Sequence, residues 1–302
     1  MSASISEKPK PVYSYLEHPL FPEGYPLIPG CTQEIFDSAL AYEPDSSDIF
    51  VVTYPKCGTT WMLNILYLIE HGGKMIGSDD NLNFHYPFIE LVGGDKVQEF
   101  KPPRVIKTHL DDRMIKHKEG VKCIFVARNP KDCVVSFFHA THDFHNLYKY
   151  EGGKFDDYFK IFMQGRVDWG DYFVMVPRWH EKSLREKDVH FMLYEDMKND
   201  PKMEIEKLAD FLGPKWSDSI KREGVLENVI KNSSFKAMKS NPLKYCITIA
   251  PKDLKFMRKG VVGDWRNTLS EEQSREIDEK MKTVGKDYPG FDKIWEKYPD
   301  LL

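Results

Sequence analysis

The sequence lacks any long hydrophobic run and any excess of positive charge. No uninterrupted apolar stretch in its 302 residues is long enough to span a bilayer, so we expect no membrane-spanning segment. The formal net charge is −4 at pH 7, which argues against a general nucleic-acid binder. Residues 1–19 lack the apolar core of a secretory signal, so we do not expect export. These absences favour a protein that works in the cytoplasm without membrane or nucleic-acid partners.

Cysteine is also scarce. The chain has 5 cysteines, an odd number, scattered without a C-x-x-C pair. This pattern suggests neither a zinc site nor a disulfide framework, and it fits a reducing compartment. Hydrophobic residues make up 41% of the chain and charged residues 30%, an ordinary globular mixture that can bury a core. The length allows one large α/β domain or two small ones.

Short apolar runs bounded by polar residues recur along the chain, at 48–55, 104–110, 121–130 and 189–197. Each has the length of a buried strand, and helical patterns lie between most of them, at 62–73, 130–147, 171–186, 201–213, 217–230 and 271–283. This alternation predicts a single α/β domain with a central, mainly parallel sheet flanked by helices.

Two segments do not fit the alternation of strands and helices. Residues 1–45 are rich in Pro, Tyr and Glu, and we expect an irregular arm with a short helix near 32–40. Residues 239–264 mix Pro, Lys and Gly without a helical period, which predicts a long loop. A loop of that length is usually functional or mobile, so we expect it to cover the binding site.

The stretch TYPKCGTTW, residues 53–61, lies between a predicted strand and a predicted helix. Backbone N–H groups and the helix dipole favour an anion at such a place. Lys56 adds a full charge, and Thr59 and Thr60 add hydroxyl donors. The stretch resembles a phosphate-binding P-loop but does not match G-x-x-x-x-G-K-[ST], because its lysine precedes its single glycine.

Ligands of parallel sheets bind beyond the carboxyl ends of the strands, so the ends at 54–56, 107–109 and 128–130 matter most. A magnesium-dependent phosphotransferase would carry a carboxylate at a neighbouring strand end, whereas this chain has Arg128. Ser136 follows about two helical turns later, and the basic sequence RKG lies at 258–260. The pattern indicates a ligand with two separate phosphate-like groups and no metal.

Lys107 and His109 alternate along a strand, so both side chains face one side. A histidine at a strand end beside a lysine and an anion loop is placed to act as a general base. Trp61, on the first turn after the loop, could stack on an adenine. Taken singly, His109 could equally be a hydrogen-bonded strand-end residue, Trp61 a core residue and Arg128 a surface ion pair. A metal-dependent nucleotide kinase or a non-catalytic nucleotide-binding protein therefore stays open at this point.

Motifs spread over nearly the whole chain resemble those of the cytosolic sulfotransferases, in the family's order. They are TYPKCGTTW, KTHL, ARNPKDCVVSFFH, LYEDMKNDP, NSSFKAMK and RKGVVGDWRN. The resemblance implies that the anion is 3′-phosphoadenosine 5′-phosphosulfate (PAPS) and that the product nucleotide is 3′-phosphoadenosine 5′-phosphate (PAP). It implies that residues at three places bind this cofactor: Lys56, Gly58, Thr59 and Thr60 at the 5′-phosphosulfate, Arg128, Ser136, Arg258, Lys259 and Gly260 at the 3′-phosphate, and Trp61, Tyr194, Ser233 and Phe235 around the adenosine.

The resemblance also implies catalytic roles. His109 would be the general base, with Lys107 assisting at the transferring group and Lys56 stabilising charge on the departing phosphate. No metal would be needed. The acceptor would be a small molecule with a hydroxyl group.

Aromatic residues suggest a flat, phenol-like acceptor. They cluster at 84–88, where Phe84, Tyr86 and Phe88 are candidate pocket residues. If Ser136 faces the cofactor, Ala140 and Asp143 share its helix face, with Asp143 about 10 Å along the axis. A carboxylate there could pair with the ammonium of a catecholamine- or phenolamine-like acceptor. Alternatively, Asp143 is an ordinary solvated helix acid.

The chain departs from the family pattern at several positions. Cys57 stands where the family usually has Ser, and we expect its thiol to be reactive and shielded by bound nucleotide. Ser233 often corresponds to Thr. The family's dimerisation motif, K-x-x-x-T-V-x-x-x-E, aligns with RNTLSEEQSR, in which Glu271 replaces Val and Arg275 replaces Glu. A buried carboxylate would be costly there, so we expect a monomer or a dimer that does not use this motif.

Overall fold

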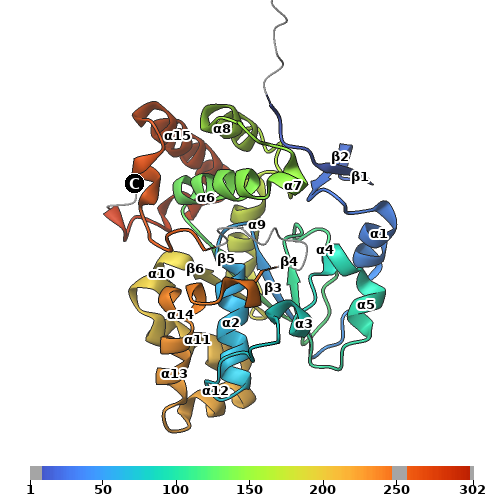
Figure 1. Cartoon of the computed structure of the whole chain (residues 1–302), viewed down its shortest axis with the longest axis vertical. Helices are drawn as coiled ribbons and strands as arrows, with labels where there is room; N and C mark the ends of the chain where they lie inside the picture. The colour runs from blue at the N-terminus through green and yellow to red at the C-terminus, as the bar shows by residue number, and fades with distance from the viewer. Residues whose placement is uncertain (1–8, 247–256, 300–302) are drawn as a thin grey trace, which may run out of the picture.

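The computed structural model describes residues 9–246 and 257–299, and a parallel sheet lies at its centre (Figure 1). Its strands run in the order β4-β3-β5-β6. Their bounds are Ile49–Thr53 (β3), Val105–Thr108 (β4), Lys122–Ala127 (β5) and Val189–Leu193 (β6). Every neighbouring pair is parallel, as the sequence predicts. The strands carry near-continuous apolar runs because both faces of the sheet are covered.

The register brings the carboxyl ends of the strands to one edge. Val51 of β3 pairs with Lys107 of β4 and with Ile124 of β5. Because the pairs are in parallel register, the chain leaves β3, β4 and β5 at the same edge of the sheet. The residues that follow these three strands are therefore neighbours in space, although the sequence separates them widely.

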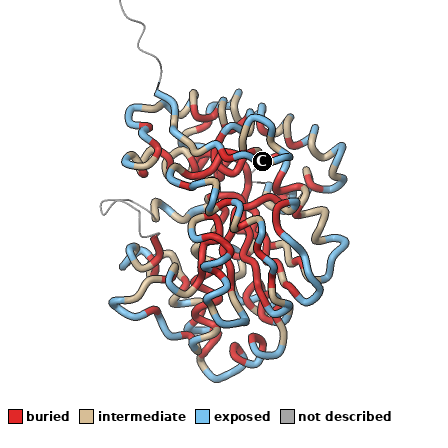
Figure 2. Tube along the Cα trace, turned by 90° about the vertical axis from the view of Figure 1, so that its right-hand side faces the viewer, coloured by how far each residue is buried: buried red, intermediate tan, exposed pale blue. Residues whose placement is uncertain are grey.

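The side chains of β3 point alternately to the two faces of the sheet, and helices cover both faces. Ile49 and Val51 belong to one apolar core, and Phe50 and Val52 to the other. Helices with side chains in the first core are α2 (Thr59–Glu70), α3 (Leu82–His85), α10 (Tyr194–Asn199), α11 (Pro201–Leu212), α12 (Pro214–Lys221), α13 (Val225–Asn232) and α14 (Phe235–Lys239). Helices with side chains in the second are α1 (Gln33–Ala41), α4 (Ile89–Val92), α5 (Gly94–Gln98), α6 (Pro130–Asp143), α7 (His145–Tyr148), α8 (Phe155–Met163), α9 (Tyr172–Arg185) and α15 (Glu271–Asp287). Figure 2 shows the buried residues gathered in the centre, around the sheet.

Two helices begin at the ligand-binding edge of the sheet. Helix α6 starts after Asn129, whose side chain accepts a hydrogen bond from the Lys131 N–H, with Pro130 at the first helical position. Helix α2 starts after Gly58 and has no side-chain cap. The N–H groups of its first turn, which have no partner within a helix, therefore remain available to a ligand.

The expectation of an irregular N-terminal arm is wrong for residues 14–27. They form an antiparallel hairpin of β1 (Ser14–His18) and β2 (Phe21–Leu27), in which Leu16 pairs with Tyr25. The prolines of β2 hide this pattern in the sequence, because proline is tolerated only on strands whose N–H groups need no partner. The predicted short helix is present as α1.

Parts of the predicted long loop at 239–264 are helical. Helix α14 reaches Lys239, and 3₁₀ helices cover Pro242–Lys244 (η1) and Asp264–Asn267 (η2). A third 3₁₀ helix, η3, covers Phe291–Lys293. Residues 247–256, the middle of the predicted covering loop, lie outside the described residues.

Candidate active site

A cavity of about 260 Å³ opens where β3, β4 and β5 end. Most of the residues predicted to bind cofactor or acceptor line it: Lys56, Gly58, Thr59, Thr60, Trp61, Lys107, His109, Arg128, Ser136, Ala140, Asp143, Tyr194, Ser233, Phe235, Arg258, Lys259 and Gly260. They come from segments that lie far apart in the sequence, and the parallel register is what brings them together.

The predicted anion loop follows β3 in an unusual backbone conformation. Lys56 has a φ of +70° and Gly58 a φ of +111°. A Cβ on Gly58 would lie 3.0 Å from Cδ2 of Tyr194, so the position requires glycine for its conformation and for space. Burial lowers the pKa of Lys56 from its ordinary value. Non-glycine residues at positive φ are rare and cluster at functional sites, which supports a ligand-binding role for the loop.

His109 is buried at the end of β4 with one ring nitrogen turned to β3. Its Nδ1 lies 2.8 Å from the carbonyl oxygen of Thr53. A carbonyl oxygen only accepts, so Nδ1 carries the proton and Nε2 is left with its lone pair. Burial and the charge of Lys107 hold the pKa of His109 well below its usual value, so the ring is neutral near pH 7. A neutral imidazole with a free lone pair can accept a proton.

Lys107 lies beside His109 with its ammonium group over an aromatic ring. Its Nζ is 3.9 Å from the centroid of the Phe88 ring, a cation–π contact. Burial lowers the pKa of Lys107 to about 8, so the side chain is mostly charged near neutral pH and loses its charge just above it.

The end of the cavity formed by β5 and the RKG segment carries three basic side chains, Arg128, Arg258 and Lys259. The Arg128 guanidinium packs over the Tyr194 ring at 4.6 Å and donates from Nη2 to the carbonyl oxygen of Val261 at 3.1 Å. Its Nε has no hydrogen-bond partner within residues 9–246 and 257–299. Arg258 Nη1 and Lys259 Nζ each lie 2.6 Å from a carboxylate oxygen of Asp264. Several N–H donors thus converge where a phosphate could bind.

Aromatic rings border the next part of the cavity. Trp61 packs edge-on against Tyr194 at 5.3 Å, and its Nε1 is unpartnered among the described residues. Gly260 packs so closely on Phe235 that a Cβ would lie 2.1 Å from Cδ2 of that ring. The arrangement leaves a slot beside Trp61 with an unused donor, which suits a flat heterocycle.

Three of the predicted acceptor residues, Phe84, Tyr86 and Phe88, do not line the cavity. Phe84 is 60% exposed, and Tyr86 is buried in the core on the other side, where its hydroxyl donates to Glu70 at 2.8 Å. Neither lines the cavity. The chain around the short helix α3 places these residues away from the strand ends. A cluster of aromatic residues in the sequence does not indicate this placement. Phe88 does not line the cavity but packs against two residues that do. Its ring contacts Lys107, and its centroid is 5.1 Å from that of His109.

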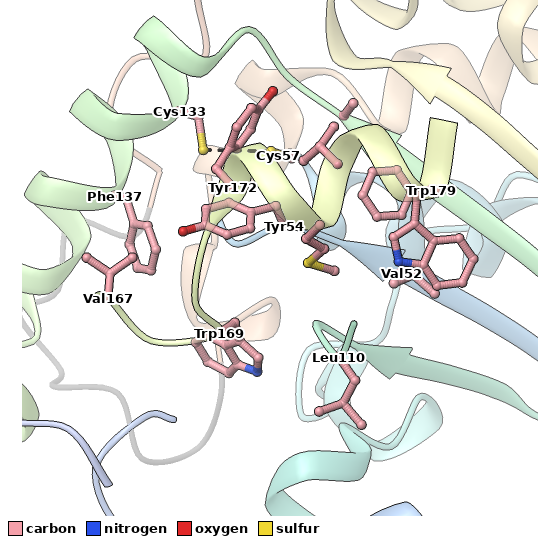
Figure 3. Close-up of a cluster of buried hydrophobic side chains, with 14 of the residues drawn as sticks. Val52, Tyr54, Cys57, Leu110, Cys133, Phe137, Val167, Trp169, Tyr172 and Trp179 are labelled. Carbon is pink, nitrogen blue, oxygen red and sulfur yellow. Dashed lines mark hydrogen bonds between the residues drawn. The ribbon is translucent and has the colours of Figure 1, made fainter. Parts of the chain in front are cut away.

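The expected reactive thiol at Cys57 is also not supported. The side chain is fully buried and turns away from the cavity, with its Sγ 3.8 Å from Sγ of Cys133 (Figure 3). Burial and the bond from Cys57 raise the pKa of Cys133 well above its usual value. Cys57 therefore points into the core, where the two thiols contact each other.

The cavity includes residues that the sequence reasoning missed. Many of them are apolar or aromatic, among them Ile28, Pro55, Phe137, Phe144, Tyr148, Trp169 and Tyr245. His139 and Lys198 also line it, and helical spacing could have found both, because they lie three and four residues after Ser136 and Tyr194. No sequence signal marks Trp169, which reaches the cavity from the loop before α9 with a φ of +60°.

Neither a metal site nor a membrane span emerges from the part of the chain that the structure describes. Across those residues, no group of three or more His, Cys, Asp or Glu side chains is arranged to hold a metal ion. None of the helices there is long and apolar enough to cross a bilayer.

Comparison with known proteins identifies the fold and the family. A family model described as "Sulfotransferase domain" matches residues 46–291. Sulfotransferase 1C2 of Oryctolagus cuniculus is 35% identical over 286 residues, covering 88% of this chain and 93% of the relative. Sulfotransferase 1A1 of Mus musculus is 36% identical over 283 residues, covering 87% and 93%. The crystal structure of mouse sulfotransferase SULT7A1 complexed with PAP superposes with a TM-score of 0.74 at 29% identity, covering 91% of this chain and 97% of that one.

Proposed function

Because the chain belongs to the sulfotransferase family, we propose that it sulfates the hydroxyl group of small phenols with His109 as general base. Family membership and the PAP complex of a relative support the coarser statement, sulfuryl transfer from PAPS to a small-molecule acceptor. One observation carries the finer one. The Nδ1 of His109 is bound to the Thr53 carbonyl oxygen, which leaves Nε2 unprotonated beside an aromatic-lined cavity.

The residues present fit the cofactor. Arg128 Nε and Trp61 Nε1 are buried donors without a partner among the described residues, and both border the cavity. A 3′-phosphate would satisfy the first, together with Ser136, Arg258 and Lys259. Adenosine would pack in the slot beside Trp61, near Tyr194, Ser233 and Phe235, with Gly260 closing it. The 5′-phosphosulfate would lie on the anion loop, at Lys56, Gly58, Thr59 and Thr60.

The reaction follows from these positions. When bound, PAPS supplies the sulfuryl group. Nε2 of His109 would accept the proton of the acceptor hydroxyl as its oxygen takes up the sulfuryl group, with PAP as the leaving group. Lys56 and the first-turn N–H groups of α2 stabilise the charge that develops on the departing phosphate. Lys107, charged below about pH 8, stabilises the transferring group.

The acceptor side favours a flat molecule with a distal amine. Phe137, Phe144, Tyr148 and Trp169 provide aromatic walls. Asp143 lines the same cavity near the end of α6, with its side chain partly buried. A partly buried carboxylate beside aromatic rings would pair well with an ammonium group, as in a catecholamine- or phenolamine-like acceptor.

The departures from the family's dimerisation motif support the monomer. Glu271 and Arg275 begin helix α15 and are 95% and 71% exposed, 3.8 Å apart as an i,i+4 pair. A two-fold patch would have to bury these charges. We therefore propose a monomer, or a dimer through another surface.

All five cysteines are free thiols, which would persist in the reducing cytoplasm.

The test is transfer of ³⁵S-labelled sulfate from PAPS to a panel of phenols, alcohols and amines. We expect labelled phenol esters, with equal initial rates in the presence and absence of EDTA. ATP-dependent phosphorylation that requires magnesium, with no labelled ester, would refute the proposal and favour a nucleotide kinase. Nucleotide binding without transfer to any member of the panel would favour a non-catalytic binding protein.

A further inference from the structure

We infer that Glu90 is a positioning residue of this site, because one of its carboxylate oxygens holds both the backbone of His109 and the indole of Trp169. The inference rests on the proposed role of His109 as the base. Glu90 lies in the short helix α4 and is fully buried. It does not line the cavity, so it acts through the two residues that do.

The hydrogen bonds of Glu90 join three separate segments. Its Oε1 accepts from the backbone N–H of His109 at 2.6 Å and from Nε1–H of Trp169 at 3.1 Å. These partners are 19 and 79 residues away in the sequence. Helix α4, the end of β4 and the loop before α9 therefore meet on one oxygen atom. Moving that atom would move the base and the cavity wall together.

The rings around His109 make this arrangement tight. The Trp169 ring centroid is 4.9 Å from that of His109, and the Phe88 centroid is 5.1 Å from it. Trp169 and Phe88 stack on each other at 5.9 Å. The imidazole is thus packed against two rings while its Nδ1 is bound to the Thr53 carbonyl. Where Nε2 points then depends on the His109 backbone, which Glu90 holds.

Trp169 needs such a partner, because its backbone conformation is unfavourable. Its φ of +60° is uncommon for a bulky residue. Three hydrogen bonds hold it there: the indole N–H donates to Glu90, the backbone N–H donates to the Pro26 carbonyl oxygen at 2.7 Å, and the Trp169 carbonyl oxygen accepts from the Tyr25 hydroxyl at 3.4 Å. Figure 3 shows Trp169 at the margin of the buried cluster. Strained residues of this kind persist where the surrounding structure determines them, commonly at active sites.

Burying a carboxyl group at this position costs desolvation free energy. Burial raises the pKa of Glu90 to about 7, and the bond from the His109 N–H opposes that rise. An apolar side chain would pack there without the desolvation cost. The carboxyl group is therefore best explained by what it holds, two donors that an apolar residue would leave unpaired.

The experiment compares Glu90→Gln, Glu90→Leu and Trp169→Phe. Glutamine keeps one carbonyl oxygen that can accept both bonds, so we expect its kcat within about threefold of wild type. Leucine leaves both buried donors without an acceptor, and that penalty is large enough to lower kcat about 10- to 100-fold. Trp169→Phe keeps an aromatic wall but loses one bond, so mainly KM for the phenol should rise. PAP affinity, measured by calorimetry, should stay within about twofold in all three.

A second readout does not depend on activity. The Trp169 indole N–H resonance, assigned by its absence in Trp169→Phe, should keep its position in Glu90→Gln and move or broaden in Glu90→Leu. Equal loss of kcat in the Gln and Leu variants would overturn the inference, because charge rather than hydrogen bonding would then matter. Weakened PAP binding in Glu90→Leu would also overturn it, by showing general damage. A wild-type protein without sulfuryl transfer would instead refute the proposed function, and the indole resonance would still report on the Glu90 bond.

Discussion

At the scale of single residues, the carbonyl oxygen of Thr53 determines what His109 can do. It accepts a hydrogen bond from Nδ1–H and so leaves the Nε2 lone pair free, while burial and Lys107 lower the pKa of His109 and keep the ring neutral. In the proposed mechanism, Lys107 stabilises the transferring group only while its side chain is charged. Two neighbouring residues at one strand end thus need opposite protonation states, and the pH range in which both have them is predictable.

The pH dependence of kcat follows from these two shifts. The pKa of His109 is lowered, so the base stays unprotonated down to well below pH 6.5. The pKa of Lys107 is lowered to about 8, so its charge is present below pH 8 and lost above it. We expect kcat to fall as pH rises through 8, and the uncharged Lys107→Met variant to be slower but flat over the same range. The same alkaline fall in both proteins would show that another group titrates.

Arg128 allows a test of the second anion subsite. Arg128→Ala should weaken PAP much more than adenosine 5′-phosphate, because only PAP carries the 3′-phosphate. Loss of a charge-assisted pair is worth about 1.5–3 kcal/mol, a factor of roughly 10 to 100 in Kd. Calorimetry with both nucleotides measures the difference. Equal losses would mean that Arg128 does not bind that phosphate.

Asp143 tests the amine part of the acceptor proposal. Asp143→Asn keeps the shape and removes the charge. KM for an amine-bearing phenol should rise about ten- to a hundredfold, because the contact is remote from sulfur and equal in ground and transition states. A neutral phenol of similar size is the control and should change little. If kcat/KM changes in parallel for the two acceptors, Asp143 is a solvated helix acid.

Site residues were predictable where they follow a strand. They were not predictable where only a cluster of similar residue types suggested them. Lys56, His109 and Arg128 follow predicted strands, and parallel pairing was enough to bring them together. Phe84 and Tyr86 share only an aromatic side chain and a nearby position in the sequence, and neither lines the cavity. Glu90 and Trp169 act through long-range bonds, and nothing local in the sequence marks such bonds.

At the scale of elements, most of the long periodic segments were predictable and most of the short ones were not. The single helix predicted at 217–230 is wrong, because the chain forms two helices there, α12 and α13, which are separated at residues 222–224. Helices α2, α6, α9, α11 and α15 fall where the apolar spacing predicts them. The hairpin of β1 and β2 was missed because its prolines resemble those of a coil. Segments of four or five residues such as α4 have no period to detect, although α4 carries Glu90.

Strand β6 gives an element-scale prediction of acid sensitivity. His190 stacks on Phe211 of α11 at 4.9 Å, and burial lowers its pKa to about 4. The unfolded chain takes up a proton near pH 6.5 that the folded chain refuses, so stability falls as pH drops from 6.5 towards 4. His190→Leu should remove about 1–3 kcal/mol of the loss in unfolding free energy between pH 8 and pH 5. Denaturant titrations at both pH values measure this. An unchanged difference would assign the acid sensitivity to other groups.

At the scale of the whole molecule, one sheet edge organises the site. The two apolar cores lie on opposite faces of β3, and both cover strands that end at the same cavity. The sequence predicted this architecture because continuous apolar runs separated by helices have few other solutions. It could not predict the whole lining of the cavity, which includes Trp169 from the loop before α9 and Ile28, the residue after the N-terminal hairpin.

The most direct test of the account is single-turnover sulfuryl transfer from ³⁵S-labelled PAPS to a phenol, in wild type and in His109→Ala. The account predicts labelled phenyl sulfate from the wild type and a rate lower by about 10²- to 10⁴-fold in the variant, the usual worth of a general base. It also predicts unchanged PAP affinity in the variant, because His109 faces the acceptor. A variant rate within a few-fold of wild type, at equal PAP affinity, would contradict the account.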